Sequence, residues 1–258
     1  MTSEPKTTLN KPIPEDILND ISKLKPYSLD SGKNPTPSRE ECFKKLVFYD
    51  PNQFENWKRA FPDPEKSPAQ FVLHLSFYYS WTKCIDDPEA SRWIQAFTNV
   101  KNLNLDFYQH TKMQTIHTSL QNLKTVKSLR LTSANIHSSI IYNFICSFPL
   151  LEDLDISYPK GGPNGTPMMD TTMLSPNTSP PLTGTLVIRE NADHVASLVS
   201  KLPCGLHFKE IDWKTTGEIP PMSALVEKCS NTLERIRINL RVAYGGFHLF
   251  GSCGRFDV

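Results

Sequence analysis

The sequence has little of what marks membrane proteins and nucleic-acid-binding proteins. No apolar run approaches the roughly 20 residues that a membrane-spanning helix needs, so we expect no membrane association. A formal net charge of +1 lacks the excess of lysine and arginine with which proteins hold nucleic acid, so no nucleic-acid partner is expected. The first ten residues are polar and contain no apolar signal-peptide core, which predicts a cytoplasmic or nuclear protein.

The cysteines and histidines also lack the spacings of known chemical sites. The six cysteines lie far apart, without a Cys-x-x-Cys pair, which argues against a zinc or redox site. Three of them stand shortly before apolar segments and are predicted to be buried free thiols: Cys146, Cys204 and Cys229. None of the seven histidines has a second ligand at metal-binding spacing.

A phosphate-binding loop is not predicted either. The glycine-rich residues 160–165 are not followed by Lys-Ser/Thr and a helix. We therefore predict no catalytic residue, no cofactor, no metal and no enzyme activity. A Ser-His-Asp arrangement is recognised by geometry rather than by sequence order, so a hydrolase stays open as a remote alternative.

What the sequence does contain is a recurring six-residue pattern, apolar-x-x-apolar-x-apolar. Five clear copies begin at Val100, Val126, Leu151, Phe208 and Leu233, and two weaker copies begin at Gln70 and Thr183. The seven starts are separated by 30, 26, 25, 32, 25 and 25 residues. Leucine-rich repeats have a period of roughly 20–29 residues, so the pattern predicts a leucine-rich-repeat-like solenoid.

Segments with helical spacing of apolar residues lie between these copies. They cover residues 88–97, 112–123, 138–148, 191–202 and 221–229. Strands that alternate with helices form parallel sheets. The predicted fold class is therefore α/β, with a parallel sheet on the concave side of the solenoid and helices on its convex side.

The composition divides the chain into further regions. Residues 1–37 are predicted to be an N-terminal helix and a linker, residues 38–69 a helical cap, and residues 70–240 the solenoid. Within the solenoid, residues 159–181 contain six prolines and three glycines, which predicts a disordered insertion. Residues 241–258 have no helical period and are predicted to be an irregular tail that covers the last repeat poorly.

The predicted cap contains one ambiguous segment. Ser38 followed by Glu41 is a capping-box pattern, which favours a helix over residues 40–48. The apolar residues Phe43, Leu46 and Phe48 fit the repeated strand pattern as well. We favour the helix, and we expect a second short helix over residues 51–60.

Positions 3, 5 and 7 of each strand copy are expected to face the concave side. For the first copy these are Val72, His74 and Ser76. The candidate protein-binding residues of the other copies are Asn102, Asn104, Asp106, Arg130, Asp153, Asp155, Arg189, Glu210, Asp212, Arg235 and Arg237. In-register strands would pair Arg130 with Asp155, Glu210 with Arg235 and Asp212 with Arg237. This set is either structural charge pairing or a docking surface for a protein partner, and both interpretations can hold together.

Residues 143–156, Asn-Phe-Ile-Cys-Ser-Phe-Pro-Leu-Leu-Glu-Asp-Leu-Asp-Ile, resemble the F-box and leucine-rich-repeat-like proteins abundant in mushroom-forming (basidiomycete) fungi. Similar stretches follow the order of that family at residues 67–70, 93–97, 179–186, 202–208 and 229–233. Residues 13–24 are similar to the first helix of an F-box, whereas its later Cys-Arg-x-Trp segment is not evident, so the F-box is degenerate or incomplete.

This resemblance implies a substrate-recognising repeat domain behind an F-box that docks to the adaptor of a cullin-RING ubiquitin ligase. The residues that it assigns to adaptor binding are Ile13, Pro14, Ile17, Leu18 and Ile21. We accordingly expect a non-catalytic protein-interaction module, monomeric outside its complex, that acts as a substrate receptor of such a ligase. The alternative is a truncated remnant of the repeat family that does not bind the adaptor.

Overall fold

The structure is a computed structural model and describes residues 39–78, 88–107, 119–120, 122–133, 144–157, 180–189, 206–215, 220–244 and 247–257. The chain divides into two units, residues 1–37 and 38–258, and all described residues belong to the second unit. The predicted N-terminal helix, with its five candidate adaptor-binding residues, lies outside the described residues. So do Cys204, the helix predicted over 191–202 and nearly all of the predicted insertion 159–181.

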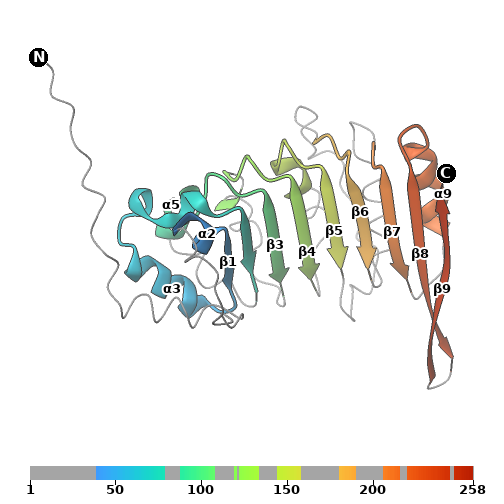
Figure 1. Cartoon of the computed structure of the whole chain (residues 1–258), viewed down its shortest axis with the longest axis horizontal. Coiled ribbons are helices and arrows are strands. Elements are labelled where there is room, and N and C mark those ends of the chain that lie inside the picture. Colours follow the sequence, from blue (N-terminus) through green and yellow to red (C-terminus); the bar gives the residue numbers. More distant parts are fainter. Residues whose placement is uncertain are drawn as a thin grey trace, which may run out of the picture. The chain divides into compact units, whose positions relative to one another are not determined.

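Nine strands form one sheet in which the spatial order follows the chain (Figure 1). The strands are β1 (Lys45–Phe48), β2 (His74–Phe77), β3 (Asn102–Phe107), β4 (Ser128–Ser133), β5 (Asp153–Ser157), β6 (Thr185–Arg189), β7 (Glu210–Thr215), β8 (Arg235–Tyr244) and β9 (Phe247–Asp257). The first eight are parallel, and β9 pairs antiparallel with β8. The prediction that the clear repeat copies form parallel strands in chain order is confirmed.

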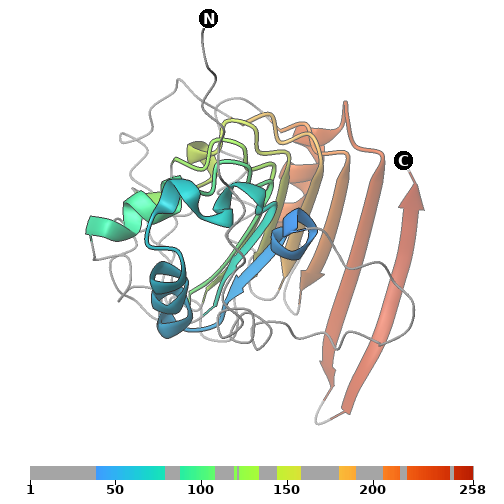
Figure 2. The ribbon, with the colours of Figure 1, turned by 60° about the vertical axis from the view of Figure 1, so that its left-hand side comes forward.

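The described helices are short, and three of them begin after a residue whose side chain caps the helix start. They are α2 (Arg39–Phe43), α3 (Pro51–Ala60), η1 (Pro64–Lys66), η2 (Pro68–Phe71), α5 (Pro88–Gln95) and α9 (Pro220–Cys229). Before α3, the Asp50 side chain accepts hydrogen bonds from the N–H groups of Asn52 and Gln53. Figure 2 shows α3 and α5 on one side of the sheet. The helices predicted over 51–60, 88–97 and 221–229 are confirmed.

The prediction of a helix over residues 40–48 is wrong. Helix α2 ends at Phe43, and β1 pairs in register with β2, where Leu46 lies beside Leu75 and Phe48 beside Phe77. Leu46 and Phe48 are both buried, whereas Lys45 between the helix and Leu46 is exposed. Burial of alternate residues against the core outweighs the local capping-box signal.

The predicted register of the first repeat is also wrong, by two residues. Strand β2 places Leu75 beside Leu103, so this copy begins at Val72 rather than Gln70. Val72 is therefore buried in the core instead of lying on the outward face. With β1 included, the copies begin at residues 43, 72, 100, 126, 151, 183, 208 and 233, with steps of 29, 28, 26, 25, 32, 25 and 25.

A repeated set of hydrogen bonds holds the start of each strand to the repeat before it. The N–H groups of Lys127 and Ser128, for example, both donate to the carbonyl of Lys101, at 2.8 and 3.0 Å. The same paired contact recurs between most neighbouring repeats. The Thr125 hydroxyl adds a bond to the Val100 carbonyl at 2.8 Å. Because these bonds satisfy the backbone at each turn, they fix the register from one repeat to the next.

The inward side chains of the parallel strands form the core. Of the six predicted core residues, Leu129, Leu131, Leu154, Ile156 and Ile211 are fully buried. The sixth, Ile236, is only half-buried, so its assignment to the core is wrong. Its strand, β8, is connected to β9 across residues 245–246 without an intervening helix, and no further repeat layer of the described chain covers it.

Aromatic residues close the core at the β1 end. Phe48 stacks on Phe77 with ring centroids 5.3 Å apart, and Phe54 meets Phe48 edge-on at 5.2 Å. Trp57 of α3 stacks on Phe97, which follows α5, at 6.2 Å. These contacts join α3 to three successive repeats, so α3 packs against the aromatic core at the β1 end, while β1 itself belongs to the sheet.

The prediction of an irregular tail over residues 241–258 is also wrong. Strand β8 continues to Tyr244, and β9 pairs along its length, with a bulge between Arg237 and Ile238. The sequence contains a signal for this hairpin, because Gly-Gly, here residues 245 and 246, is a dipeptide that favours two-residue hairpin connections. The unpaired edge of β8 is thereby covered by β9.

Candidate binding face of the sheet

One face of the parallel strands carries polar side chains, and we call it the open face. It consists of positions 3, 5 and 7 of each repeat, which alternate with the buried residues. Position 5 across the eight strands is occupied by Val47, Ser76, Asn104, Arg130, Asp155, Val187, Asp212 and Arg237. Position 7 is occupied from β3 onward by Asp106, Thr132, Ser157, Arg189, Lys214 and Asn239.

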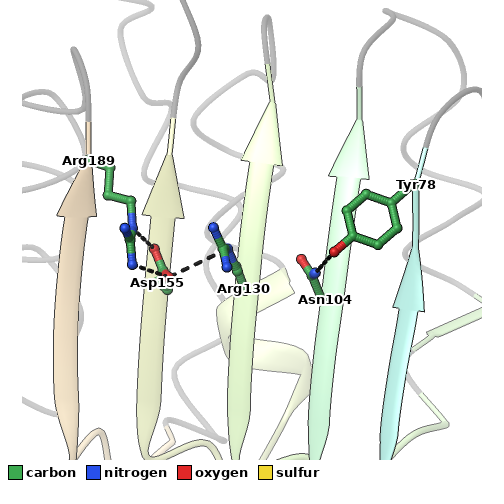
Figure 3. Close-up of polar contacts among 5 residues, drawn as sticks. All are labelled: Tyr78, Asn104, Arg130, Asp155 and Arg189. Atoms are coloured by element: carbon green, nitrogen blue, oxygen red, sulfur yellow. Dashed lines mark hydrogen bonds and ion pairs between the residues drawn. The ribbon is translucent and has the colours of Figure 1, made fainter. Parts of the chain in front are cut away.

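A charge cluster lies at the centre of the open face (Figure 3). Arg189 donates two hydrogen bonds to Asp155, from Nε to Oδ1 at 3.0 Å and from Nη2 to Oδ2 at 3.1 Å. Arg130 approaches the same carboxylate from the other side, at 3.5 Å. The predicted pairing of Arg130 with Asp155 is confirmed. The Arg130 side chain stays 49 % exposed, whereas that of Asp155 is 19 % exposed.

Of the other two predicted pairs, one forms an ion pair and the other is a pair of register neighbours. Arg235 Nη1 lies 2.6 Å from Glu210 Oε1, as expected from their register. Asp212 and Arg237 are register neighbours as well. The carboxylate of Asp212, however, accepts a hydrogen bond from Asn239 Nδ2 at 3.4 Å. The first pair is confirmed as an ion pair, and the second is confirmed as a neighbour relation.

Two tyrosines belong to the open face and are absent from the predicted set. Tyr49 and Tyr78 follow the register-paired Phe48 and Phe77, and their rings stack with centroids 5.3 Å apart. Asn104 Nδ2 donates a hydrogen bond to the Tyr78 hydroxyl at 2.9 Å (Figure 3). Sequence reasoning missed both because it placed a helix at β1 and shifted β2 by two residues.

Asp106 has an unusual position on this face. It follows Leu105, the register partner of Phe77, and is half-buried. Burial raises the pKa of its carboxyl group, and the positive charge of Arg130 opposes this effect. Among the described residues, no hydrogen bond or ion pair reaches the Asp106 carboxylate.

Asp153 has a structural role that the sequence did not indicate. Its Oδ1 accepts a hydrogen bond from the backbone N–H of Thr185 at 2.7 Å. A Cβ atom at Gly184 would collide with this carboxylate, so glycine is needed where β6 approaches β5. Two residues earlier, Leu182 has a φ of 44°, a left-handed conformation that is uncommon for leucine. Asp153 thus holds the start of β6 after the long insertion.

The rest of the described chain shows no cluster of side chains that would form a metal site. Those residues include no group of three or more His, Cys, Asp and Glu side chains that could hold a metal ion. Cys229 is buried, and burial raises the pKa of its thiol. Cys146 is only half-buried, contrary to prediction. No described helix is long and apolar enough to cross a membrane.

A pocket of about 310 Å³ lies away from the open face, beside η1, η2 and α5. Its lining residues are Pro64, Glu65, Ser67, Gln70, Arg92, Gln95, Ala96 and Thr98. The Ser67 hydroxyl in this pocket donates to the Pro64 carbonyl at 2.6 Å and accepts from the Ala69 N–H at 3.3 Å. It serves as a local turn contact.

No protein-family model matches the chain, and a search of curated proteins finds no match either. The geometry of the open face is therefore the basis for a functional interpretation. That geometry consists of an extended polar surface with exposed aromatic and arginine side chains.

Proposed function

We propose that this protein is a non-catalytic protein-interaction module that binds a protein partner on the open face. The observation that carries this proposal is the in-register row of outward side chains at position 5, which are polar in all of the eight parallel strands except β1 and β6 and lie opposite the buried core. Such a row offers an extended surface rather than an enclosed pocket, which suits a protein partner better than a small molecule.

The proposal includes a leucine-rich-repeat-like solenoid, with the open face concave and the helices convex. Two features support this architecture. The repeat starts are spaced by 25 to 32 residues, and the same paired hydrogen bonds connect successive turns. Because each repeat then contacts chiefly its neighbours, equal positions line up along the array and can be changed without changing the fold.

Internal charge pairing alone accounts for only part of the open face. Glu210 forms an ion pair with Arg235, and Asp155 forms one with Arg189. Tyr49, by contrast, is 44 % exposed, and about half of the Arg130 side chain is exposed. Tyrosine and arginine are enriched at protein interfaces and at their energetic hot spots, so these two residues favour the docking interpretation.

This docking proposal is tested by comparing two double variants as baits for the partner. Tyr49→Ser with Arg130→Ser removes the exposed side chains of the open face. Leu150→Ser with Lys66→Ser removes an equally exposed apolar residue and an exposed cation elsewhere. We expect specific partners to be lost with the first variant and retained with the second. Partners retained equally by both would contradict the proposal.

We further propose that the module is a substrate receptor of a cullin-RING ubiquitin ligase in the cytoplasm or nucleus. Support comes from the similarity of residues 13–24 to an F-box helix. The test is a pull-down of the purified ligase adaptor with the full chain and with an Ile17→Asp, Ile21→Asp double variant. A matched control, Asn10→Asp with Asn19→Asp, adds the same two charges and removes no apolar residue.

Adaptor binding that is lost only in the isoleucine variant would support the ligase role. Absence of binding in the parent chain, or unchanged binding in the isoleucine variant, would overturn it and leave the remnant alternative. The interaction proposal for the open face is independent of this result, because it rests on residues 45–239.

A further inference from the structure

Three side chains at the β1–β3 end of the open face form a row of their own. Tyr49, Tyr78 and Asp106 directly follow residues that are register partners across β1, β2 and β3. Neighbouring strands lie about 4.8 Å apart, so the three positions span about 10 Å. The row begins with a stacked aromatic pair and ends with a carboxylate, and we call it the Tyr-Tyr-Asp corner.

The tyrosines supply a fixed apolar surface. The Tyr78 hydroxyl accepts the hydrogen bond of Asn104, and its ring is stacked on Tyr49. Tyr49 is one of two large hydrophobic residues that are exposed in the described chain, the other being Leu150 in a turn. A ring that is held in place and open to water loses little conformational entropy when a partner covers it.

Asp106 supplies a negative charge that no hydrogen bond or ion pair from the described residues reaches. Its side chain is half-buried, and this burial raises the pKa of the carboxyl group. The neighbouring cation Arg130 is directed at Asp155, 3.5 Å away (Figure 3). A partly desolvated carboxylate without a donor is unfavourable, and a cationic donor from a partner would relieve this cost.

We propose that the Tyr-Tyr-Asp corner binds a lysine or arginine side chain of an extended segment of the partner protein. In this arrangement the charged head contacts Asp106 and the aliphatic stem packs on Tyr78 and Tyr49. This inference rests on the proposed function of the open face and specifies what that face recognises. Arg130 lies on β4, the strand next to Asp106, so the residue of the partner that follows toward β4 should be neutral or acidic rather than basic.

The inference is tested with a library of random dodecapeptides selected on the full chain. We expect the selected peptides to share one required basic residue, and their affinity to fall about tenfold for Asp106→Asn. Asp106→Glu, which keeps the charge, should retain most of the affinity. The matched control Asp63→Asn removes an exposed carboxylate in the turn before η1, away from the sheet, and should leave affinity unchanged.

Other results distinguish failure of this inference from failure of the proposed function. One outcome would overturn the corner assignment alone. In it, the selected peptides lack a basic residue and bind equally to the parent and to Asp106→Asn, but do not bind the Tyr49→Ser, Arg130→Ser double variant. Peptides that ignore every open-face variant would overturn both. If Asp106→Asn is poorly folded, Tyr49→Ser combined with the salt dependence of peptide affinity decides the question, because binding to the carboxylate must weaken as salt rises.

Discussion

The two faces of the same strands follow different rules. On β4, Leu129 is fully buried, whereas its chain neighbour Arg130 is half-exposed. The equivalent inward position is Leu or Ile in all eight parallel strands. The equivalent outward position varies among Val, Ser, Asn, Arg and Asp. The inward face is restricted by packing, and the outward face is free to be adapted to a partner.

The largest expected change in stability comes from a substitution on the buried face. Leu154→Ala removes a fully buried side chain of β5 and should lower the free energy of unfolding by about 2–5 kcal/mol. The control Val187→Ala shortens an apolar side chain on the open face of β6 and should change it by less than about 0.5 kcal/mol. Both are measured by denaturant unfolding. Equal effects from the two variants would mean that the faces are wrongly assigned.

The next largest effect on stability is expected at the junction between β5 and β6. There the outward residue Asp153 forms a hydrogen bond that holds the start of β6. Gly184→Ala places a Cβ against the Asp153 carboxylate and should cost about 1–3 kcal/mol. Asp153→Ala alone loses the hydrogen bond to Thr185. In a double-mutant cycle the two costs should be less than additive, since both act on one contact. Strict additivity would show that the two residues are not coupled.

In the charge cluster, two arginines share the carboxylate of Asp155, and we expect them to contribute unequally to stability. Arg189 holds Asp155 with two hydrogen bonds, whereas Arg130 only approaches it. Arg189→Ala should therefore destabilise by about 1 kcal/mol and Arg130→Ala by about 0.2 kcal/mol, with both effects reduced in high salt. Thermal unfolding at two salt concentrations measures this difference. A larger loss from Arg130→Ala would reverse our assignment of which arginine is structural.

The smallest expected effect concerns the pH dependence at Asp106. A carboxyl group whose pKa is raised in the folded state disfavours folding when it is ionised, so its unfavourable contribution is fully present above the folded-state pKa and is lost as the pH falls from that pKa to the lower pKa of the unfolded state. Asp106→Asn should thus be at least as stable as the parent at pH 7. This small advantage should vanish near pH 3, where the carboxyl group is largely protonated in both states. Paired melting curves at the two pH values provide the check.

Much of the fold was predictable because the inward residues repeat at nearly constant spacing. Leu129, Leu131, Leu154 and Ile156 are buried as their pattern requires. The errors arose where two local signals competed. At β1 a capping box and a strand pattern overlap, and only pairing with β2 decides between them. The hairpin of β8 and β9 was not predicted, because residues 241–258 lack a helical period and the only local signal for the hairpin is the Gly-Gly dipeptide at 245–246.

The open face was predicted less completely than the core. Arg130, Asp155, Glu210 and Arg235 pair as their positions indicate. Arg189 was not expected to bind Asp155, because this contact runs diagonally between positions 5 and 7 of neighbouring strands. Diagonal contacts depend on side-chain length and twist, which a position count omits.

The central claim is that the open face, and not the helical side, is the binding surface. It is tested most directly by mapping a selected peptide onto the full chain with amide chemical-shift changes. We predict shifts concentrated at Tyr49, Tyr78, Asn104, Asp106 and Arg130. Shifts concentrated instead on α5 and α9, with the open-face amides unchanged, would contradict the account.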